Sequence, residues 1–300
     1  MKTFIFSICM VTICQIVLAQ QSYMDKRSNQ QLWGKIAVQD LKEEPYIAWY
    51  EKSANTYEAR LQDKDKELFK DINVKIFLGT WCGDTKYLLP RFIKSWESMG
   101  LDLEKVEFIA VHNAEENYKQ GPSGETVGKN IHKVPTIIFE KGATEIGRIV
   151  ERSVFDLETD MVQIVSNNVY EERYQAVKIL DQFFSETSKD SLSLASNLNL
   201  CAKKLRRELT SVYDLSSYGY VLLAQNEMEQ AEFTFKLNKK LFPYNPVVYE
   251  GIGDYKKKKG DLRGAMQSYY EVLRIKKEDD YALKQLSEMQ LLLESTTLKS

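Results

Sequence analysis

The sequence predicts an α/β domain with a central mixed sheet flanked by helices, followed by an all-α helical-repeat domain. As far as residue 167, apolar runs rich in β-branched and aromatic residues alternate with segments of helical spacing. From residue 168 onward the chain is rich in Leu, Lys, Glu and Gln, with few glycines and no strand pattern. An internal sequence repeat in this second part also favours helices.

The composition describes a globular chain without a strong overall charge. The 300 residues are 43% hydrophobic and 28% charged, which excludes collagen-like, fibrous and wholly disordered proteins. Lys and Arg number 41 against 43 Asp and Glu, so the formal net charge is -2. Because this balance creates no field that attracts phosphates or acidic lipids, we expect no nucleic-acid partner.

The N-terminal residues 1–19 have the pattern of a secretory signal peptide. Lys2 precedes an apolar stretch from Phe4 to Leu18, and Val17-Leu18-Ala19 is a small-residue cleavage motif. The stretch is shorter than the ~20 residues that a membrane-spanning helix needs. We therefore expect an exported protein, periplasmic or extracellular, whose mature chain begins near Gln20 and has no transmembrane segment.

Each element of the first part has its own signal in the sequence. Residues 20–69 are predicted to form a polar, flexible lead-in and then a helix that starts at Pro45. Four strands and two helices are predicted over residues 70–167, the strands at 73–79, 106–111, 136–139 and 145–151 and the helices at 84–99 and 155–165. Alternation of strands and helices is typical of a layered α/β domain.

The second part, residues 168–300, contains two related units between about 213 and 278. Gly219 and Gly253 are separated by the same interval as Phe235 and Tyr269. Small residues let neighbouring helices approach closely, and the aromatic residues fill the next layer. The units resemble tetratricopeptide repeats, whose period is about 34 residues, and this resemblance implies a surface for a protein partner. Since about three repeats are usually needed for stability, we expect additional helices on both sides to complete the stack.

Two motifs in the first part carry the chemistry. The first is Gly79-Thr80-Trp81-Cys82-Gly83-Asp84-Thr85, between a predicted strand and a helix that contains Pro90. The second is Ile131-His-Lys-Val134-Pro135-Thr136, just before another strand. A thiol at a helix N-terminus faces unpaired N–H groups and the positive end of the helix dipole, which favour the thiolate. We therefore expect Cys82 to be the reactive cysteine, with the Thr85 hydroxyl donating to its sulfur.

These two motifs resemble those of the thioredoxin family over roughly residues 70 to 166. The resemblance implies a thioredoxin fold, thiol–disulfide exchange at Cys82 and a cis peptide bond between Val134 and Pro135. It also implies that Trp81, Val134 and Pro135 bind the client. No cofactor and no metal are expected, because two histidines in the whole chain give little support to a metal site.

The sequence departs from the family at two positions. Thr85 stands where a resolving cysteine would complete the motif, and Ile76 stands where thioredoxins often carry a buried acid. Without a second thiol, the mixed disulfide that Cys82 forms is not released within the motif. We expect Cys201 to be a buried structural cysteine, the alternative being that it meets Cys82. We expect His132 on the surface, the alternative being a place beside Cys82.

Two functions remain open, and whether the protein is an enzyme remains open with them. In the first, the single thiol Cys82 acts in thiol–disulfide exchange, in the manner of an oxidoreductase, and forms a mixed disulfide with a client protein or peptide. The helical repeats then bind a protein partner. In the second, the chain is a non-catalytic adaptor in which the thioredoxin fold and the tetratricopeptide-like repeats only bind other proteins.

Overall fold

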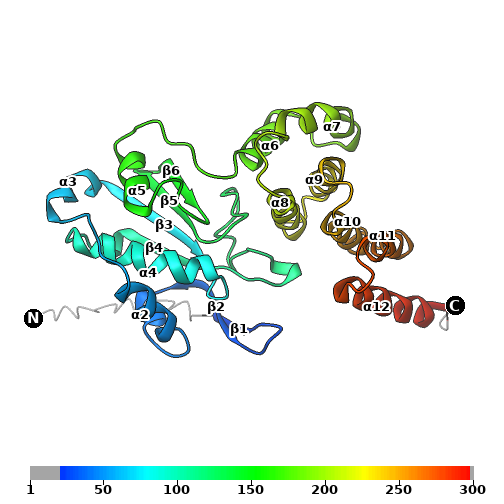
Figure 1. The fold of residues 1–300 in the computed structure, drawn as a ribbon, viewed down its shortest axis with the longest axis horizontal. Coiled ribbons are helices and arrows are strands. Elements are labelled where there is room, and N and C mark those ends of the chain that lie inside the picture. The colour runs from blue at the N-terminus through cyan, green and yellow to red at the C-terminus, as the bar shows by residue number, and fades with distance from the viewer. Residues whose placement is uncertain (1–20, 298–300) are drawn as a thin grey trace, which may run out of the picture.

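The computed structural model describes residues 21–297, so the predicted signal peptide lies outside the described residues. A six-stranded mixed sheet with helices forms the N-terminal part, and an all-helical region forms the C-terminal part (Figure 1). The strand order is β1-β2-β4-β3-β5-β6. Between residues 21 and 297, no helix combines the length and the apolarity needed to cross a membrane.

The centre of the sheet is formed by β3 (Ile72–Leu78), with β4 (Val106–Ala110) on one side and β5 (Thr136–Lys141) on the other. The β3–β4 pair is parallel, and α4 (Gly83–Ser98) provides the crossover that such a pair requires. β5 runs antiparallel to β3 and to the edge strand β6 (Thr144–Val150). These elements confirm the strands and the central helix that the sequence predicts.

The residues predicted to be a flexible lead-in form two strands instead, so that prediction is wrong. β1 (Gln21–Met24) and β2 (Gln30–Ile36) make an antiparallel hairpin, and β2 extends the sheet by pairing with β4. The polar sequence of β2 concealed this role. Its Gln31 is buried and accepts a hydrogen bond from the Thr80 hydroxyl at 2.7 Å. A partner distant along the chain thus satisfies a polar group that looks solvent-exposed in the sequence.

Short helices and α4 cover the sheet. They are α1 (Val38–Leu41), α2 (Ile47–Asn55), α3 (Lys66–Phe69) and α5 (Leu157–Val165). Phe92 and Trp96 of α4 are fully buried, and their rings stack at 5.7 Å. The Phe92 ring also packs edge-on against Phe139 of β5 at 6.3 Å. The contact with Phe139 fixes α4, which follows the first motif, against β5, which follows the second motif.

A buried carboxylate ties the N-terminal segment to this core. Glu158 of α5 accepts hydrogen bonds from the Ser95 hydroxyl at 2.7 Å and from the backbone N–H groups of Arg60 and Leu61. Burial acts to raise the pKa of Glu158, but these hydrogen bonds outweigh it and hold the pKa below its ordinary value. Glu158 is therefore a charged link between α4, α5 and the segment after α2.

The helices of the C-terminal part, as far as residue 297, are α6 (Gln175–Glu186), α7 (Ser191–Leu205), α8 (Val212–Ala224), α9 (Met228–Leu241), α10 (Pro246–Lys258), α11 (Leu262–Ile275) and α12 (Asp280–Thr297). They follow one another in a curved row (Figure 1). The interval from the start of α8 to the start of α10 equals the interval from the start of α9 to the start of α11. The pair α8–α9 is thus followed by a second pair, α10–α11, with the same spacing along the chain.

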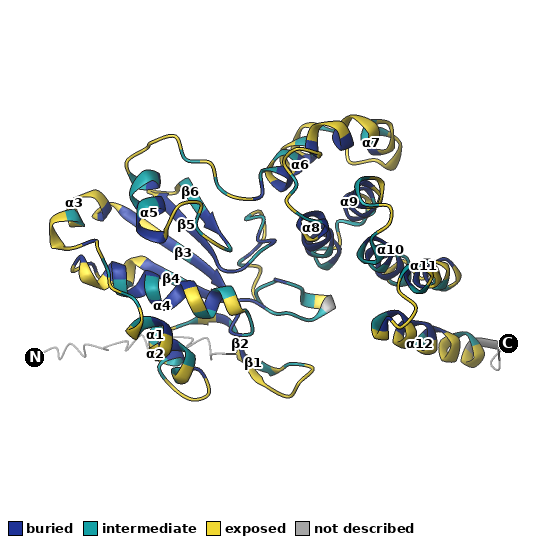
Figure 2. Ribbon diagram, viewed as in Figure 1, coloured by how far each residue is buried: buried dark blue, intermediate teal, exposed yellow. Residues whose placement is uncertain are grey.

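The glycines of the repeat lie where the helices approach most closely. A Cβ atom on Gly219 would lie 2.6 Å from the Phe235 ring, and one on Gly253 would lie 2.7 Å from the Tyr269 ring. The same contact therefore recurs in the second pair of helices, as the sequence spacing predicts. Figure 2 shows that buried residues follow the facing sides of these helices, while α12 is largely exposed on its outer side.

Candidate functional site

Cys82 lies where β3 ends and α4 begins. It is the N-cap residue of α4, with an extended backbone at φ -87° and ψ 129°, and its side chain is half-buried. The thiol donates a hydrogen bond to the Val134 carbonyl oxygen, and the S···O distance is 3.1 Å. Because the first N–H groups of a helix have no partner within it, the sulfur lies at the positively polarised end of α4.

The turn before Cys82 is shaped by a tryptophan packed on a glycine. The Trp81 indole N–H donates to the Val111 carbonyl at 3.2 Å. A Cβ atom on Gly79 would lie 2.5 Å from the Trp81 ring, closer than side chains approach each other. The Cys82 N–H donates to the Gly79 carbonyl at 2.9 Å. Gly79 is therefore required by the close approach of the indole, and the indole borders the thiol.

Thr85 lies in the first turn of α4 and is fully buried. Its Oγ1 accepts a hydrogen bond from the Gly79 N–H at 3.3 Å. Within the described residues, no hydrogen bond joins Thr85 to the Cys82 sulfur, so the structure gives the predicted donation no support. Thr85 instead fastens the end of β3 to the start of α4. Its neighbour Asp84 pairs with Arg152 at 2.8 Å, outside this turn.

The second motif faces the thiol across the end of the sheet. The Val134–Pro135 peptide bond is cis, as the resemblance implies. Pro135 is held from the other side, since its carbonyl accepts a hydrogen bond from the Glu151 N–H at 2.7 Å. Within residues 21–297, the Val134 N–H has no hydrogen-bond partner. The structure thus brings together Trp81, Cys82, Val134 and Pro135, four of the five residues predicted for the site, around one sulfur atom.

A buried lysine joins this loop to the helical part. Lys119 is only 3% exposed, and its ammonium donates to the Tyr118 hydroxyl at 2.6 Å, the His132 carbonyl at 2.7 Å and the Ser217 hydroxyl of α8 at 2.9 Å. Burial lowers the pKa of Lys119. Because His132 shortly precedes Val134 in the chain, the ammonium links α8 to the loop that contacts Cys82. Sequence reasoning missed Lys119, since a lysine in a polar loop usually faces solvent.

The prediction of a surface position for His132 is wrong. The residue is 5% exposed, and its ring packs edge-on against Tyr174 at 5.6 Å and Tyr218 at 6.2 Å. Burial lowers the pKa of His132 to about 3, so the ring is neutral at physiological pH. The ring Nδ1 lies 3.2 Å from the Asn130 carbonyl oxygen. His132 is buried because α8 covers its loop, which the local sequence does not reveal.

The two cysteines of the described chain lie in different hydrophobic cores. Cys201 is buried in α7 among residues of the helical part, and burial raises the pKa of its thiol. Cys82 borders the cluster formed by strands of the sheet, and both thiols are free. The prediction of a buried Cys201 is confirmed. The structure gives no support to a dithiol formed by Cys82 and Cys201.

The fold and the site define an α/β domain with a single half-buried thiol at the N-terminus of its central helix, facing a cis-proline loop. Thioredoxin-2 of Saccharomyces cerevisiae is 30% identical over 105 residues, which are 33% of this chain and 81% of the yeast protein. The chain belongs to the thioredoxin family. No protein-family model and no solved structure matches it. The similarity suggests thiol–disulfide redox chemistry and covers a third of the chain.

Proposed function

We propose that this is an exported thioredoxin-like protein that uses the single thiol Cys82 in thiol–disulfide exchange with a client protein or peptide. The observation that carries the proposal is the half-buried Cys82 sulfur at the N-terminus of α4, 3.1 Å from the Val134 carbonyl. A thiol in this position is exposed enough to react and is held in one orientation. The sulfur lies at the positively polarised N-terminus of α4, the end of a helix that attracts anionic groups.

The exchange step is balanced without an external oxidant or reductant. Cys82 gives its proton to solvent, and its sulfur attacks one sulfur of a client disulfide. A new S–S bond joins Cys82 to that client cysteine, while the client disulfide breaks and its other sulfur leaves as a thiolate, which solvent protonates. The Val134 N–H, which has no partner within residues 21–297, is placed to pair with the main chain of the client beside the reacting sulfur.

The mixed disulfide persists until another thiol arrives. Thr85 occupies the resolving position, and Cys201 is buried in another core. Release therefore requires attack on the mixed disulfide by a thiol from outside the chain, such as a small-molecule thiol or a second client cysteine. The proposal thus predicts capture of clients rather than rapid turnover.

We infer in addition that the helical part is a tetratricopeptide-like stack that binds a protein partner. The equal offset of α8 from α10 and of α9 from α11 supports this inference, together with the recurring contact of a glycine with an aromatic ring. Export rests on the signal-peptide pattern of residues 1–19.

A non-catalytic adaptor is the second candidate function. The observation that favours it is the fully buried Ile76 in β3 together with Thr85, since these residues replace the acid and the second thiol of the dithiol cycle. In this case the thioredoxin fold and the helices bind partners, and Cys82 contributes nothing to binding.

Alkylation and trapping distinguish the two candidates. In the folded protein, iodoacetamide should modify Cys82 at least about tenfold faster than Cys201, because Cys201 is buried. Cys201→Ser provides the background for measuring Cys82 alone by mass spectrometry. A peptide activated as a 2-pyridyl disulfide should form a mixed disulfide that dithiothreitol releases, and Cys82→Ser should abolish it. An unreactive Cys82, with the same partners recovered by wild type and Cys82→Ser, would favour the adaptor.

A further inference from the structure

We propose that a cavity beside Trp81 binds acidic residues of the client peptide, so that Cys82 reacts preferentially with disulfides flanked by Asp or Glu. The inference rests on the proposed function and names the class of client that the site prefers. It concerns a cavity that neither the sequence motifs nor the comparison with yeast thioredoxin-2 points to.

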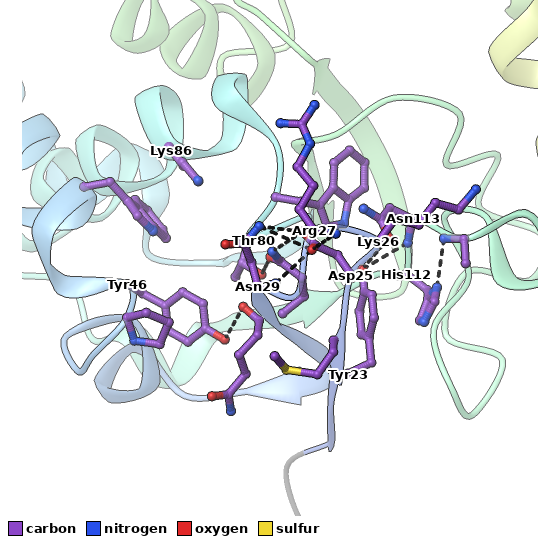
Figure 3. Close-up of a pocket in the computed structure, with 17 residues that line it drawn as sticks. Tyr23, Asp25, Lys26, Arg27, Asn29, Tyr46, Thr80, Lys86, His112 and Asn113 are labelled. Carbon is purple, nitrogen blue, oxygen red and sulfur yellow. Dashed lines mark hydrogen bonds between the residues drawn. The ribbon is translucent and has the colours of Figure 1, made fainter. Parts of the chain in front are cut away.

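The cavity has a volume of about 690 Å³ and lies between the β1–β2 hairpin, the start of α2 and the turn before Cys82 (Figure 3). This volume is typical of pockets that hold a ligand. Trp49, Tyr46 and Trp81 provide aromatic lining. Because Trp81 is the residue next to Cys82, a peptide joined to the sulfur passes the mouth of the cavity.

The charged groups of the cavity are mainly positive. Lys26 and Arg27 of the hairpin turn and Lys86 of α4 line it, against one carboxylate, Asp25. Figure 3 shows Lys86 reaching in from the helix and Arg27 standing on the hairpin side. His112, which also lines the cavity, adds no charge at neutral pH, because burial lowers its pKa.

The single carboxylate is already engaged within its own turn. Asp25 accepts hydrogen bonds from the backbone N–H groups of Arg27 and Asn29 at 2.8 and 2.9 Å and from the Gln31 side chain at 3.0 Å. By contrast, neither Arg27 nor Lys86 forms an ion pair with any residue of the described chain. Lys86 lies 6.0 Å from the Trp49 ring, which positions its ammonium over an aromatic wall. Two cations are thus available to an anionic ligand.

A peptide with acidic residues fits these features. Carboxylate side chains pair with Arg27 and Lys86, and the apolar stems of Glu residues lie against the aromatic wall. β1 is an edge strand of the sheet and lines the same cavity, so an extended chain has a main-chain edge beside it. The charge complementarity therefore favours a client segment with Asp or Glu a few residues from the reacting cysteine.

The test compares matched peptides, each carrying one cysteine activated as a neutral 2-pyridyl disulfide. Two Glu residues are placed two to four positions before or after the cysteine, and the controls carry Gln or Lys at the same positions. Release of pyridine-2-thione reports the attack of Cys82. In wild type, one of the acidic peptides should react about three- to tenfold faster than its Gln counterpart at low ionic strength, and salt should reduce this preference.

Arg27→Gln should remove most of the preference, so that the acidic peptide and its Gln counterpart react at similar rates. Arg263→Gln, which makes the same change at an exposed arginine of α11, should keep the preference. Equal rates for acidic and Gln peptides in wild type, or a full preference in Arg27→Gln, would overturn the proposal.

A binding measurement separates failure of this inference from failure of the proposed function. An acidic peptide without cysteine is titrated into Cys82→Ser and followed by tryptophan fluorescence, since Trp49 and Trp81 line the cavity. If the acidic peptide binds and Arg27→Gln weakens this binding, the cavity is supported as the binding site, even if Cys82 proves unreactive. No binding, together with normal reaction of the Gln peptide, overturns the cavity and leaves thiol–disulfide exchange in place.

Discussion

Replacing Gly79 by alanine should disrupt the site through the tryptophan that lies on it. The added Cβ atom would lie 2.5, 2.8 and 2.9 Å from three atoms of the Trp81 indole. All three distances are shorter than side chains tolerate, so the indole must leave its place. The Gly79 backbone is not in the left-handed region, and the effect is therefore one of space alone.

The loss in the free energy of unfolding follows from the interactions that Trp81 gives up when it is displaced. Its hydrogen bond to the Val111 carbonyl contributes about 0.5–1.5 kcal/mol. Exposing about half of the indole returns on the order of 100 Å² to water, or about 2.5 kcal/mol at ~25 cal/mol per Å². Alanine offsets up to about 1 kcal/mol of this loss, because it lowers the conformational entropy of the unfolded chain relative to glycine. We therefore expect Gly79→Ala to lower the free energy of unfolding by about 2–4 kcal/mol.

Urea unfolding followed by far-ultraviolet circular dichroism measures this change, and tryptophan emission reports whether Trp81 has moved. Gly83→Ala is the matched control, because a Cβ atom there meets nothing within 4 Å and the residue lies in the first turn of α4. It should be neutral or slightly stabilising. A Gly79→Ala protein as stable as Gly83→Ala, with unchanged tryptophan emission, would refute the packing argument.

Three further predictions concern the fold around the site. The pKa of Glu158 is lower in the folded chain than its ordinary value of 4.5. The ionised carboxylate therefore stabilises the folded chain fully above pH 4.5, and this stabilisation is lost as the pH falls through the pKa of the folded state. Glu158→Gln should cost about 2 kcal/mol in urea unfolding at pH 7, with a smaller difference in acid; equal stability at pH 7 would contradict this. Gly253→Ala should destabilise the helical part by about 1–3 kcal/mol by displacing Tyr269, and the urea midpoint should fall accordingly. Ser217→Ala should remove one hydrogen bond of Lys119 and cost about 1 kcal/mol, and hydrogen exchange around residues 130–135 should rise; unchanged exchange would mean that α8 does not hold this loop.

Local patterns in the sequence were sufficient for the elements that carry the thiol. β3 is rich in β-branched and aromatic residues and ends in the apolar run Ile76-Phe77-Leu78, and the helix that follows starts directly after Cys82, so their junction is visible without any long-range contact. The regular spacing of Gly219 and Gly253 likewise indicates helix contacts that the structure contains. In these places a short stretch of chain determines both its conformation and its buried face.

Tertiary contacts decided the structure of the polar hairpin and of the surroundings of the thiol. The polar hairpin β1–β2 becomes part of the sheet only because β4, much later in the chain, provides its hydrogen-bond partners. Lys119 contacts Ser217 of α8, and the His132 ring packs against Tyr174 and Tyr218 of the helical part. The cavity beside Trp81 is likewise assembled from segments far apart in the sequence. By itself, the sequence determined where the Cys82 thiol lies, at the junction of β3 and α4. What surrounds that thiol depends on groups that approach only in the folded chain, and no local pattern encodes that approach.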